Sequence, residues 1–352
     1  MCIYINYIFS YGMKYKTVAI VMIVAIISIL IMNNALFVGT GIREESLSTY
    51  TSTRSIMDTT VTVTVLGSNE IKAHESINEA FGRIEYVDGL MNTYDNNSEL
   101  SLLNRQGYIT DTNPDLIYVV DRSRYYSETS HGAFDVSILP LLDLWKSKFS
   151  PGGTYTAPTE DEINETLRLV NYSAIVIENN NITLGEDMML TLGGLAKGYA
   201  VDLAVESLIE DGVESGFVNA GGDGRYLGTK EGGIPWKVGL QNPEKIHEAV
   251  VVMDIQDMAV ATSGNYERYF NESARVSHIS DPRTGQPSQG LISATVITAS
   301  AMDADAFATA LFVMGEQEGV EMIEELEGVE CLIITEDRRI IRSSGFSQYE
   351  SE

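Results

Sequence analysis

A carboxylate and a hydroxyl lie four residues apart near the start of one predicted helix. Ser300 and Asp303 have the spacing of a capping box, which places the first helical turn at residue 301. Asp305 and Thr309 then stand at positions i and i+4, so both side chains project from one face of the helix. Hard oxygen ligands suit Mg²⁺ or Ca²⁺ better than zinc, so the pair predicts a site for such a cation. An alanine-rich core helix with a good N-terminal cap is the other interpretation.

A histidine at the end of a predicted strand is the candidate acid or base. His278 lies in the β-prone run 275–279, just before the turn Asp-Pro-Arg-Thr-Gly at residues 281–285. Segments of this kind often present functional side chains, although a structural hydrogen bond would equally account for a histidine there. The chain has four histidines and no His-x-x-x-His or cysteine pair, which argues against a zinc site.

Two glycine-rich turns could bring backbone N–H groups close to a phosphate. The first, residues 193–198, is not a Walker A loop, because Lys197 precedes its glycine and no Ser or Thr follows at the metal position. The second, residues 221–224, lacks the dinucleotide-binding fingerprint, because its third glycine falls at Gly228 and a strand follows instead of a helix. The sequence therefore argues against P-loop kinases and Rossmann enzymes, and each loop alone is also compatible with a tight turn.

The elements that must position these residues alternate irregularly along the chain. Helices are predicted after the turn at 193–198 and after Ser300, and also over residues 69–92, 115–129, 159–170 and 316–326. Strands are predicted at 59–66, 174–177, 182–184, 216–219, 225–227, 236–240, 249–254, 258–262, 275–279, 291–297 and 329–335. Helices and hairpins mix without a strict βαβ repeat, which predicts an α+β fold and not a doubly wound sheet.

The chain is acidic and has an apolar segment near its amino terminus. Its formal net charge of −27 over 352 residues argues against nucleic acid and anionic lipid surfaces as partners. Residues 17–32 are uncharged and follow two lysines, so residues 1–38 are expected to be a signal peptide or a membrane anchor, with the rest outside the cytoplasm. Residues 39–55, rich in Ser, Thr and Gly, are expected to be a tether. Cys2 and Cys331 lie on opposite sides of the apolar segment and leave no internal disulfide framework.

Five motifs follow one another along the chain: AFD at residues 133–135, LGGLAKGYAVD at 192–202, NAGG at 219–222, HxxDPxTG at 278–285 and ADAFATA at 304–310. Their order resembles that of the ApbE family, the FAD:protein FMN transferases long labelled thiamine biosynthesis lipoproteins. The chain resembles this family over about residues 53–345. The resemblance implies a single α+β, T-fold-like domain at residues 56–345, followed by a tail at 346–352. It also implies that the domain holds FAD in a groove and uses Mg²⁺ at the pyrophosphate.

The resemblance, matched motif by motif, assigns roles to individual residues. Asp305 and Thr309 correspond to the metal-binding side chains, Ala196 to a metal-binding backbone carbonyl, and His278 to the histidine proposed as acid or base. The positions that correspond to the lining of the FAD site are Met57, Tyr94, Ala133, Phe134, Asp135, Gly193, Lys197, Asp202 and Ser280. Two features depart from the family pattern. Met-Asp-Thr at residues 57–59 replaces the usual Met-Gly-Thr, and the lipoprotein cysteine is missing.

The resemblance implies transfer of FMN from FAD to a Thr or Ser hydroxyl of a partner flavoprotein, expected to be a membrane redox subunit. The product is a phosphoester, and AMP is released. An Mg²⁺-dependent FAD pyrophosphatase, which yields FMN and AMP with water as the nucleophile, is the alternative reaction. A non-catalytic FAD-binding module is the alternative of another class. The implied location is the cell membrane with the catalytic domain outside the cytoplasm, or secretion after signal cleavage.

Overall fold

The computed structural model describes residues 46–149, 153–242, 245–264, 269–271, 276–277 and 279–351. Residues 47–352 form one compact unit. The segment expected to be an anchor or signal peptide, residues 1–38, lies outside the described residues, and so does His278. Within the described ranges, no helix has the length and apolar character needed to cross a membrane.

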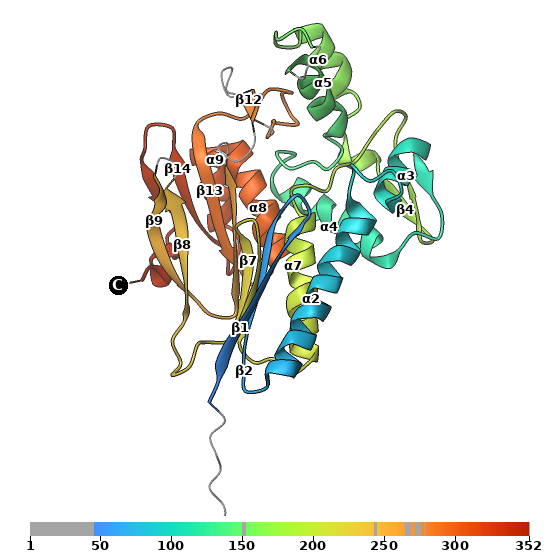
Figure 1. Cartoon of the computed structure of the whole chain (residues 1–352). Helices are drawn as coiled ribbons and strands as arrows, with labels where there is room; N and C mark the ends of the chain where they lie inside the picture. The colour runs from blue at the N-terminus through green and yellow to red at the C-terminus, as the bar shows by residue number, and fades with distance from the viewer. Residues whose placement is uncertain are drawn as a thin grey trace, which may run out of the picture. The chain divides into compact units, whose positions relative to one another are not determined.

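An eight-stranded sheet with antiparallel neighbours is the centre of the fold (Figure 1). In spatial order the strands are β1 Ser48–Ile56, β2 Thr59–Gly67, β6 Gly216–Ala220, β7 Asp223–Leu227, β10 Met258–Gly264, β13 Leu291–Thr298, β14 Glu330–Thr335 and β15 Ile340–Arg342. An antiparallel sheet with helices packed against it is an α+β fold, as the sequence predicted.

Helices cover one face of this sheet. They are α2 Glu70–Met91, α7 Ala196–Glu210, α8 Ala301–Met314 and α9 Glu316–Glu324. The valines of β2 at positions 61, 63 and 65 are buried in the core that these helices share with the sheet. The threonines that alternate with them face the other way, where Thr62 and Thr64 hydrogen-bond Thr53 and Thr51 of β1. The alternation of Val and Thr therefore decides which face of β2 meets the helices.

A hairpin covers part of the opposite face. It consists of β8 Trp236–Asn242 and β9 Lys245–Ile255, and its apolar residues pack on those of β10, β13 and β14. Phe346, in the short helix η2 Phe346–Tyr349, is fully buried in this second core. The stretch from residue 346, expected to be a tail, therefore begins as part of the fold.

The tether expected over residues 39–55 ends earlier than its composition suggested. Residues 48–56 form β1, which pairs with β2 in an unbroken antiparallel register from Ser48↔Gly67 to Ile56↔Thr59. Threonine is favoured in strands, so a Ser/Thr-rich stretch beside a complementary strand becomes an edge strand. Met57 and Asp58 form the tight turn between the two strands, with φ values of 55° and 54°. The Asp58 that replaces the family's glycine thus adopts the left-handed conformation that glycine would adopt most easily.

The remaining described elements lie outside the eight-stranded sheet. They are α3 Glu99–Gln106, β3 Tyr108–Ile109, α4 Pro114–Thr129, α5 Leu139–Phe149, α6 Glu160–Leu167, η1 Tyr172–Ala174, β4 Val176–Glu178, β5 Asn181–Thr183, β11 Tyr269–Asn271 and β12 Val276–Ser277. Helices α5 and α6 enclose a small apolar core of their own, at the top of Figure 1. Trp145 ties this core to the turn at residues 281–285, because its Nε1 donates to the Gly285 carbonyl at 2.8 Å. Gly285 has φ +74°, and a Cβ there would collide with Ile163, so the turn requires glycine.

Candidate active site

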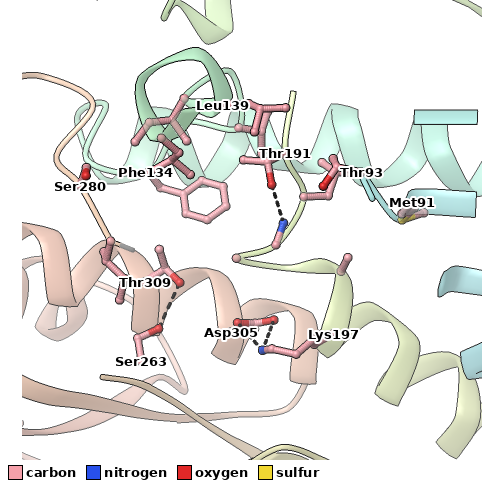
Figure 2. Close-up of a pocket in the computed structure, with 18 of the residues that line it drawn as sticks. Met91, Thr93, Phe134, Leu139, Thr191, Lys197, Ser263, Ser280, Asp305 and Thr309 are labelled. Atoms are coloured by element: carbon pink, nitrogen blue, oxygen red, sulfur yellow. Dashed lines mark hydrogen bonds and ion pairs between the residues drawn. The ribbon is translucent and has the colours of Figure 1, made fainter. Parts of the chain in front are cut away.

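A pocket of about 920 Å³ opens where α8, the glycine turn before α7 and the α5 segment meet (Figure 2). Its volume lies at the upper end of the range for small-molecule sites. The lining comes from seven stretches of the sequence, at residues 57–59, 88–94, 133–146, 191–197, 262–264, 279–282 and 305–313, together with Gly221. Only the folded chain brings these stretches together.

The structure places most of the residues that the sequence pointed to around this one pocket. Those that line it are Met57, Tyr94, Ala133, Phe134, Asp135, Gly193, Ala196, Lys197, Ser280, Asp305 and Thr309. His278 is not among the described residues, but Ile279 and Ser280 beside it line the pocket. Asp202 does not line the pocket, and its actual place is described below.

Asp305 and Thr309 lie one turn apart on α8, as their spacing predicted. Ser300 caps the helix by accepting a hydrogen bond from the Asp303 N–H at 3.2 Å. The Asp303 carboxylate does not complete the capping box, because it accepts instead from Tyr126 and Arg122 of α4, at 2.5 and 3.1 Å. The helix face that carries Asp305 is thereby turned to the pocket while Asp303 holds α8 against α4.

The hydroxyl of Thr309 lies in a space that a glycine keeps open. Its Oγ1 shares a hydrogen bond of 3.1 Å with the Oγ of Ser263, the penultimate residue of strand β10. A Cβ at Gly194 would lie 3.3 Å from Thr309 Oγ1 and 3.1 Å from the ring of Phe134. Glycine at this position therefore lets the backbone of the 193–198 turn approach both side chains closely.

The turn at residues 133–135 orients an aromatic ring toward the pocket. Gly132, with φ +80°, lies two residues after Ser130, the C-cap of α4, and its N–H donates to the Ser127 carbonyl at 2.8 Å. The Asp135 carboxylate accepts from Ser137 N–H and Oγ and from Tyr172 N–H, at 2.6 to 3.0 Å. Burial raises the pKa of Asp135 above its ordinary value, and these three donors offset only part of the rise. Asp135 thus anchors the loop that presents the Phe134 ring in Figure 2.

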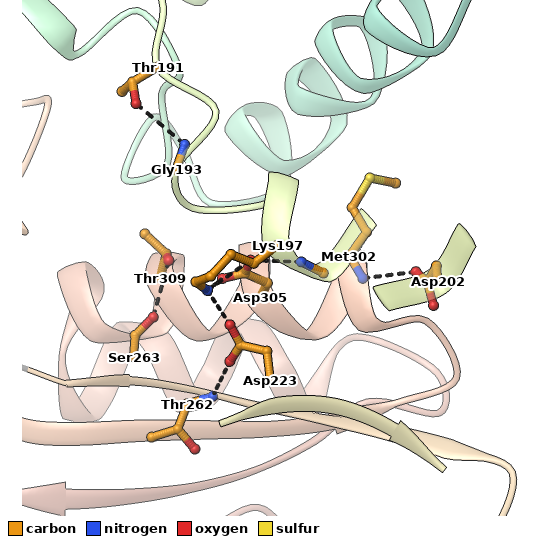
Figure 3. Close-up of polar contacts among 11 residues, drawn as sticks. Thr191, Gly193, Lys197, Asp202, Asp223, Thr262, Ser263, Met302, Asp305 and Thr309 are labelled. Carbon is orange, nitrogen blue, oxygen red and sulfur yellow. Dashed lines mark hydrogen bonds and ion pairs between the residues drawn. The ribbon is translucent and has the colours of Figure 1, made fainter. Parts of the chain in front are cut away.

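Lys197 joins two buried carboxylates at the base of the pocket (Figure 3). Its Nζ hydrogen-bonds Asp223 Oδ2 and lies 3.4 Å from Asp305 Oδ2. Asp223 also accepts from Thr262 N–H at 3.2 Å, and Asp305 accepts from Gly198 N–H at 3.1 Å. Burial raises the pKa of the Asp305 carboxyl to about 7, the Lys197 ammonium opposes this rise, and the charge of Asp223 adds to it. The pair of carboxylates therefore shares one ammonium, and a further cation would compensate their remaining charge.

Asp223 and Ser263 belong to this site although sequence reasoning did not identify them. Asp223 follows directly on Gly221-Gly222, and an acidic residue right after a glycine pair was the available signal. Ser263 lies in a β-prone run and has no local feature that marks it. Its role depends on β10 lying beside α8, which is a tertiary contact.

Asp202 was expected to line the FAD site. It lies outside the pocket lining and contacts the first turn of α8 instead. Its carboxylate accepts from Ser300 Oγ at 2.7 Å and from the N–H groups of Ala301 and Met302 at 2.9 and 3.0 Å. Arg225 Nη1 donates to it at 2.9 Å. A carboxylate at this place satisfies the free N–H groups of the first helical turn and opposes the positive end of the helix dipole. Asp202 therefore positions the helix that carries Asp305 and Thr309.

Asp202→Ala should lower the free energy of unfolding by about 2–4 kcal/mol, because it removes a helix cap and leaves Arg225 partly unpaired. Urea denaturation of the purified variant measures this loss. Glu206→Ala is the matched control, because its exposed carboxylate lies 3.8 Å from the same guanidinium. We expect that control to stay within about 0.5 kcal/mol of the wild type. Unchanged stability of Asp202→Ala together with lost FAD binding would return Asp202 to the ligand site.

Comparisons with known proteins agree with this geometry. The family model described as the ApbE family matches residues 57–333. A FAD:protein FMN transferase of Vibrio cholerae is 33% identical over 280 residues, which cover 76% of this chain and 80% of that protein. The FAD:protein FMN transferase of Treponema pallidum is 28% identical over 295 residues, which cover 78% and 81%. The residues that the family model matches include the strands from β2 to β13, the four covering helices and all the residues that line the pocket.

Solved structures show the same fold. The crystal structure of the ApbE protein from Thermotoga maritima superposes with a TM-score of 0.79 at 30% identity, and the match covers 87% of this chain and all of that chain. The flavin transferase ApbE from Vibrio cholerae superposes with a TM-score of 0.75 at 28% identity, covering 86% of this chain and all of that chain.

Proposed function

This chain belongs to the ApbE family and is a FAD:protein FMN transferase, and we propose that it requires Mg²⁺ and attaches FMN to a Thr or Ser hydroxyl of its acceptor. The observation that carries the metal requirement is the face of α8 within the pocket. There a buried carboxylate and a hydroxyl stand one turn apart, opposite a glycine-rich turn.

The donor set in the pocket fits Mg²⁺. Asp305 supplies a carboxylate and Thr309 a hydroxyl, while Ala196 lines the same pocket from the first turn of α7 and could supply its carbonyl. All three are hard oxygen donors, and Mg²⁺ in proteins is usually held by one or two carboxylates, with water and substrate phosphates as its other ligands. In a chain of net charge −27, a cation at this place would also offset the repulsion of a diphosphate.

Several residues would bind and orient FAD. Lys197 would bring an ammonium to the diphosphate, and the 193–194 backbone would approach it closely because the turn has no Cβ atoms there. Phe134 presents its ring to the pocket (Figure 2). Ser280 Oγ is buried in the lining and has no hydrogen-bond partner among the described residues, so a bound ligand would satisfy it.

The proposed reaction is a displacement at phosphorus. The hydroxyl oxygen of the acceptor forms a bond to the phosphorus of the FMN half, and the bond from that phosphorus to the bridging oxygen breaks. AMP leaves with the bridging oxygen, and the hydroxyl proton passes to His278. When bound, Mg²⁺ would stabilise the negative charge on the diphosphate oxygens. The chain's own residues would position the two reacting atoms in line.

One experiment separates this reaction from its alternatives. The full chain, FAD, Mg²⁺ and a candidate acceptor flavoprotein are incubated together, and the acceptor and the nucleotides are analysed by mass spectrometry. Transfer adds one FMN to the acceptor and releases AMP. Free FMN and AMP with an unmodified acceptor would identify a pyrophosphatase, and unchanged FAD would identify a binding module. A parallel incubation with EDTA tests the metal requirement.

The amino-terminal segment leads to a proposal about location. We propose that residues 1–38 anchor the enzyme in the cell membrane with its catalytic domain outside the cytoplasm, where it would meet a membrane redox subunit as acceptor. The support is the uncharged run at residues 17–32 after two lysines. Amino-terminal sequencing of protein from the membrane fraction should give an intact segment. A soluble mature chain that begins near residues 35–45 would show instead that the segment is a cleaved signal peptide.

A further inference from the structure

Three charged side chains from three different elements meet at the base of the pocket. Lys197 comes from the first turn of α7, Asp223 is the first residue of β7, and Asp305 lies in the second turn of α8 (Figure 3). The side chains of Asp223 and Asp305 are 3% and 5% exposed, whereas that of Lys197 is 28% exposed. A partly exposed ammonium therefore lies between two buried carboxylates.

The two contacts of this ammonium are unequal. The contact of Lys197 Nζ with Asp223 Oδ2 is the shorter, and Nζ lies 3.4 and 3.5 Å from the two carboxylate oxygens of Asp305. Each carboxylate is also held by a backbone N–H group, Asp223 by that of Thr262 and Asp305 by that of Gly198. Both acids are therefore fixed, and the flexible lysine side chain is the group that can shift between them.

We propose that Lys197 neutralises Asp305 until a divalent cation binds there, and that Asp223 is the positioning residue that then retains Lys197. This inference rests on the metal site of the proposed function. Two buried carboxylates cannot both stay charged without a cation nearby. In the protein without a bound metal ion, the ammonium of Lys197 is such a cation. A divalent cation at Asp305 repels the ammonium, and Asp223 offers the ammonium a place to remain.

Two positive charges would then lie side by side in the pocket. With the cation on Asp305 and the ammonium of Lys197 kept by Asp223, both face the space in which the diphosphate would lie. Without Asp223, Lys197 would have Asp305 as its remaining carboxylate partner in this trio and would compete with the cation for it. Asp223 would thus act on cation affinity through Lys197 and not as a ligand.

The test is Mg²⁺ binding to the full chain in the absence of FAD, measured by titration calorimetry for four proteins. These are the wild type, Asp223→Asn, Lys197→Met and the double variant. We expect Asp223→Asn to weaken Mg²⁺ binding by roughly tenfold or more in the wild-type background, a coupling of ordinary size for charges in contact. Lys197→Met should bind Mg²⁺ at least as tightly as the wild type. In that background Asp223→Asn should weaken binding by no more than about threefold, because only the general field changes.

Controls separate this inference from the proposed function. Asp143→Asn, which removes an exposed carboxylate from the lining of the same pocket, measures the general effect of one lost negative charge. Circular dichroism and thermal melting confirm that each variant is folded. An equal effect of Asp223→Asn in both backgrounds, or weaker binding by Lys197→Met, would overturn the inference. If Asp305→Asn abolishes Mg²⁺ binding in either of those cases, the metal site of the proposed function still stands. Absence of Mg²⁺ binding by the wild type would overturn both.

Discussion

Asp305→Ala should abolish flavin transfer, lowering the rate by roughly 10³-fold or more, because the proposed site loses its carboxylate ligand. The variant should also bind FAD more weakly, since the diphosphate would then face an acidic pocket without the compensating cation. The measurement is the rate of FMN transfer to the acceptor as a function of Mg²⁺ concentration, together with FAD binding by fluorescence quenching.

Asp303→Ala is the matched control for Asp305→Ala. It removes a carboxylate from the same helix, two residues earlier, but one that contacts Arg122 and Tyr126 and does not line the pocket. This control should lose stability and keep the Mg²⁺ dependence of the folded enzyme. A wild-type rate and Mg²⁺ dependence in Asp305→Ala would show that the metal assignment is wrong.

His278→Ala should slow transfer by roughly 10²- to 10⁴-fold if the histidine accepts the proton of the attacking hydroxyl. FAD affinity and melting temperature should stay close to those of the wild type, because a general base acts in the transition state and not in ligand binding. A structural histidine would behave in the opposite way, with a loss of about 1–3 kcal/mol in stability from an unmade hydrogen bond.

The rate, FAD affinity and melting temperature must be measured on the same preparation of His278→Ala. His74→Ala serves as the control, because His74 is exposed on α2 and outside the pocket, with an edge contact to Tyr50. A fall in rate that only follows the loss of folded protein would remove the catalytic role of His278. The metal ion and the positioning of the reactants would then account for the reaction, which is plausible for a loose phosphoryl-transfer transition state.

Features that depend on neighbouring residues could be predicted from the sequence. The Asp305 and Thr309 pair follows from the i, i+4 geometry of a helix, and the structure places both in the pocket. The strands predicted at 174–177 and 182–184 correspond to the hairpin of β4 and β5, in whose turn Asn179 and Asn180 adopt positive φ values. The helices predicted at residues 69–92 and 115–129 likewise agree with α2 and α4 to within a residue at each end.

Elements that form only by pairing or packing with another segment were not predicted. β1 was interpreted as a tether because a polar Ser/Thr stretch becomes a strand only beside a partner, and β2 is that partner. α3 and α5 were missed for a similar reason. α5 buries its apolar side against α6 and the Gly285 turn, which lies 140 residues from Trp145.

The role of each carboxylate near the site depends on the tertiary structure. The motif that contains Asp202 could not reveal that its carboxylate caps a helix that begins at residue 301, nor could the glycine pair before Asp223 reveal its contact with Lys197. A carboxylate has the same local sequence signal whether it binds a ligand, caps a helix or holds a lysine. Which of these it does depends on the donors that the fold brings within about 3 Å of it, and those come from elsewhere in the chain.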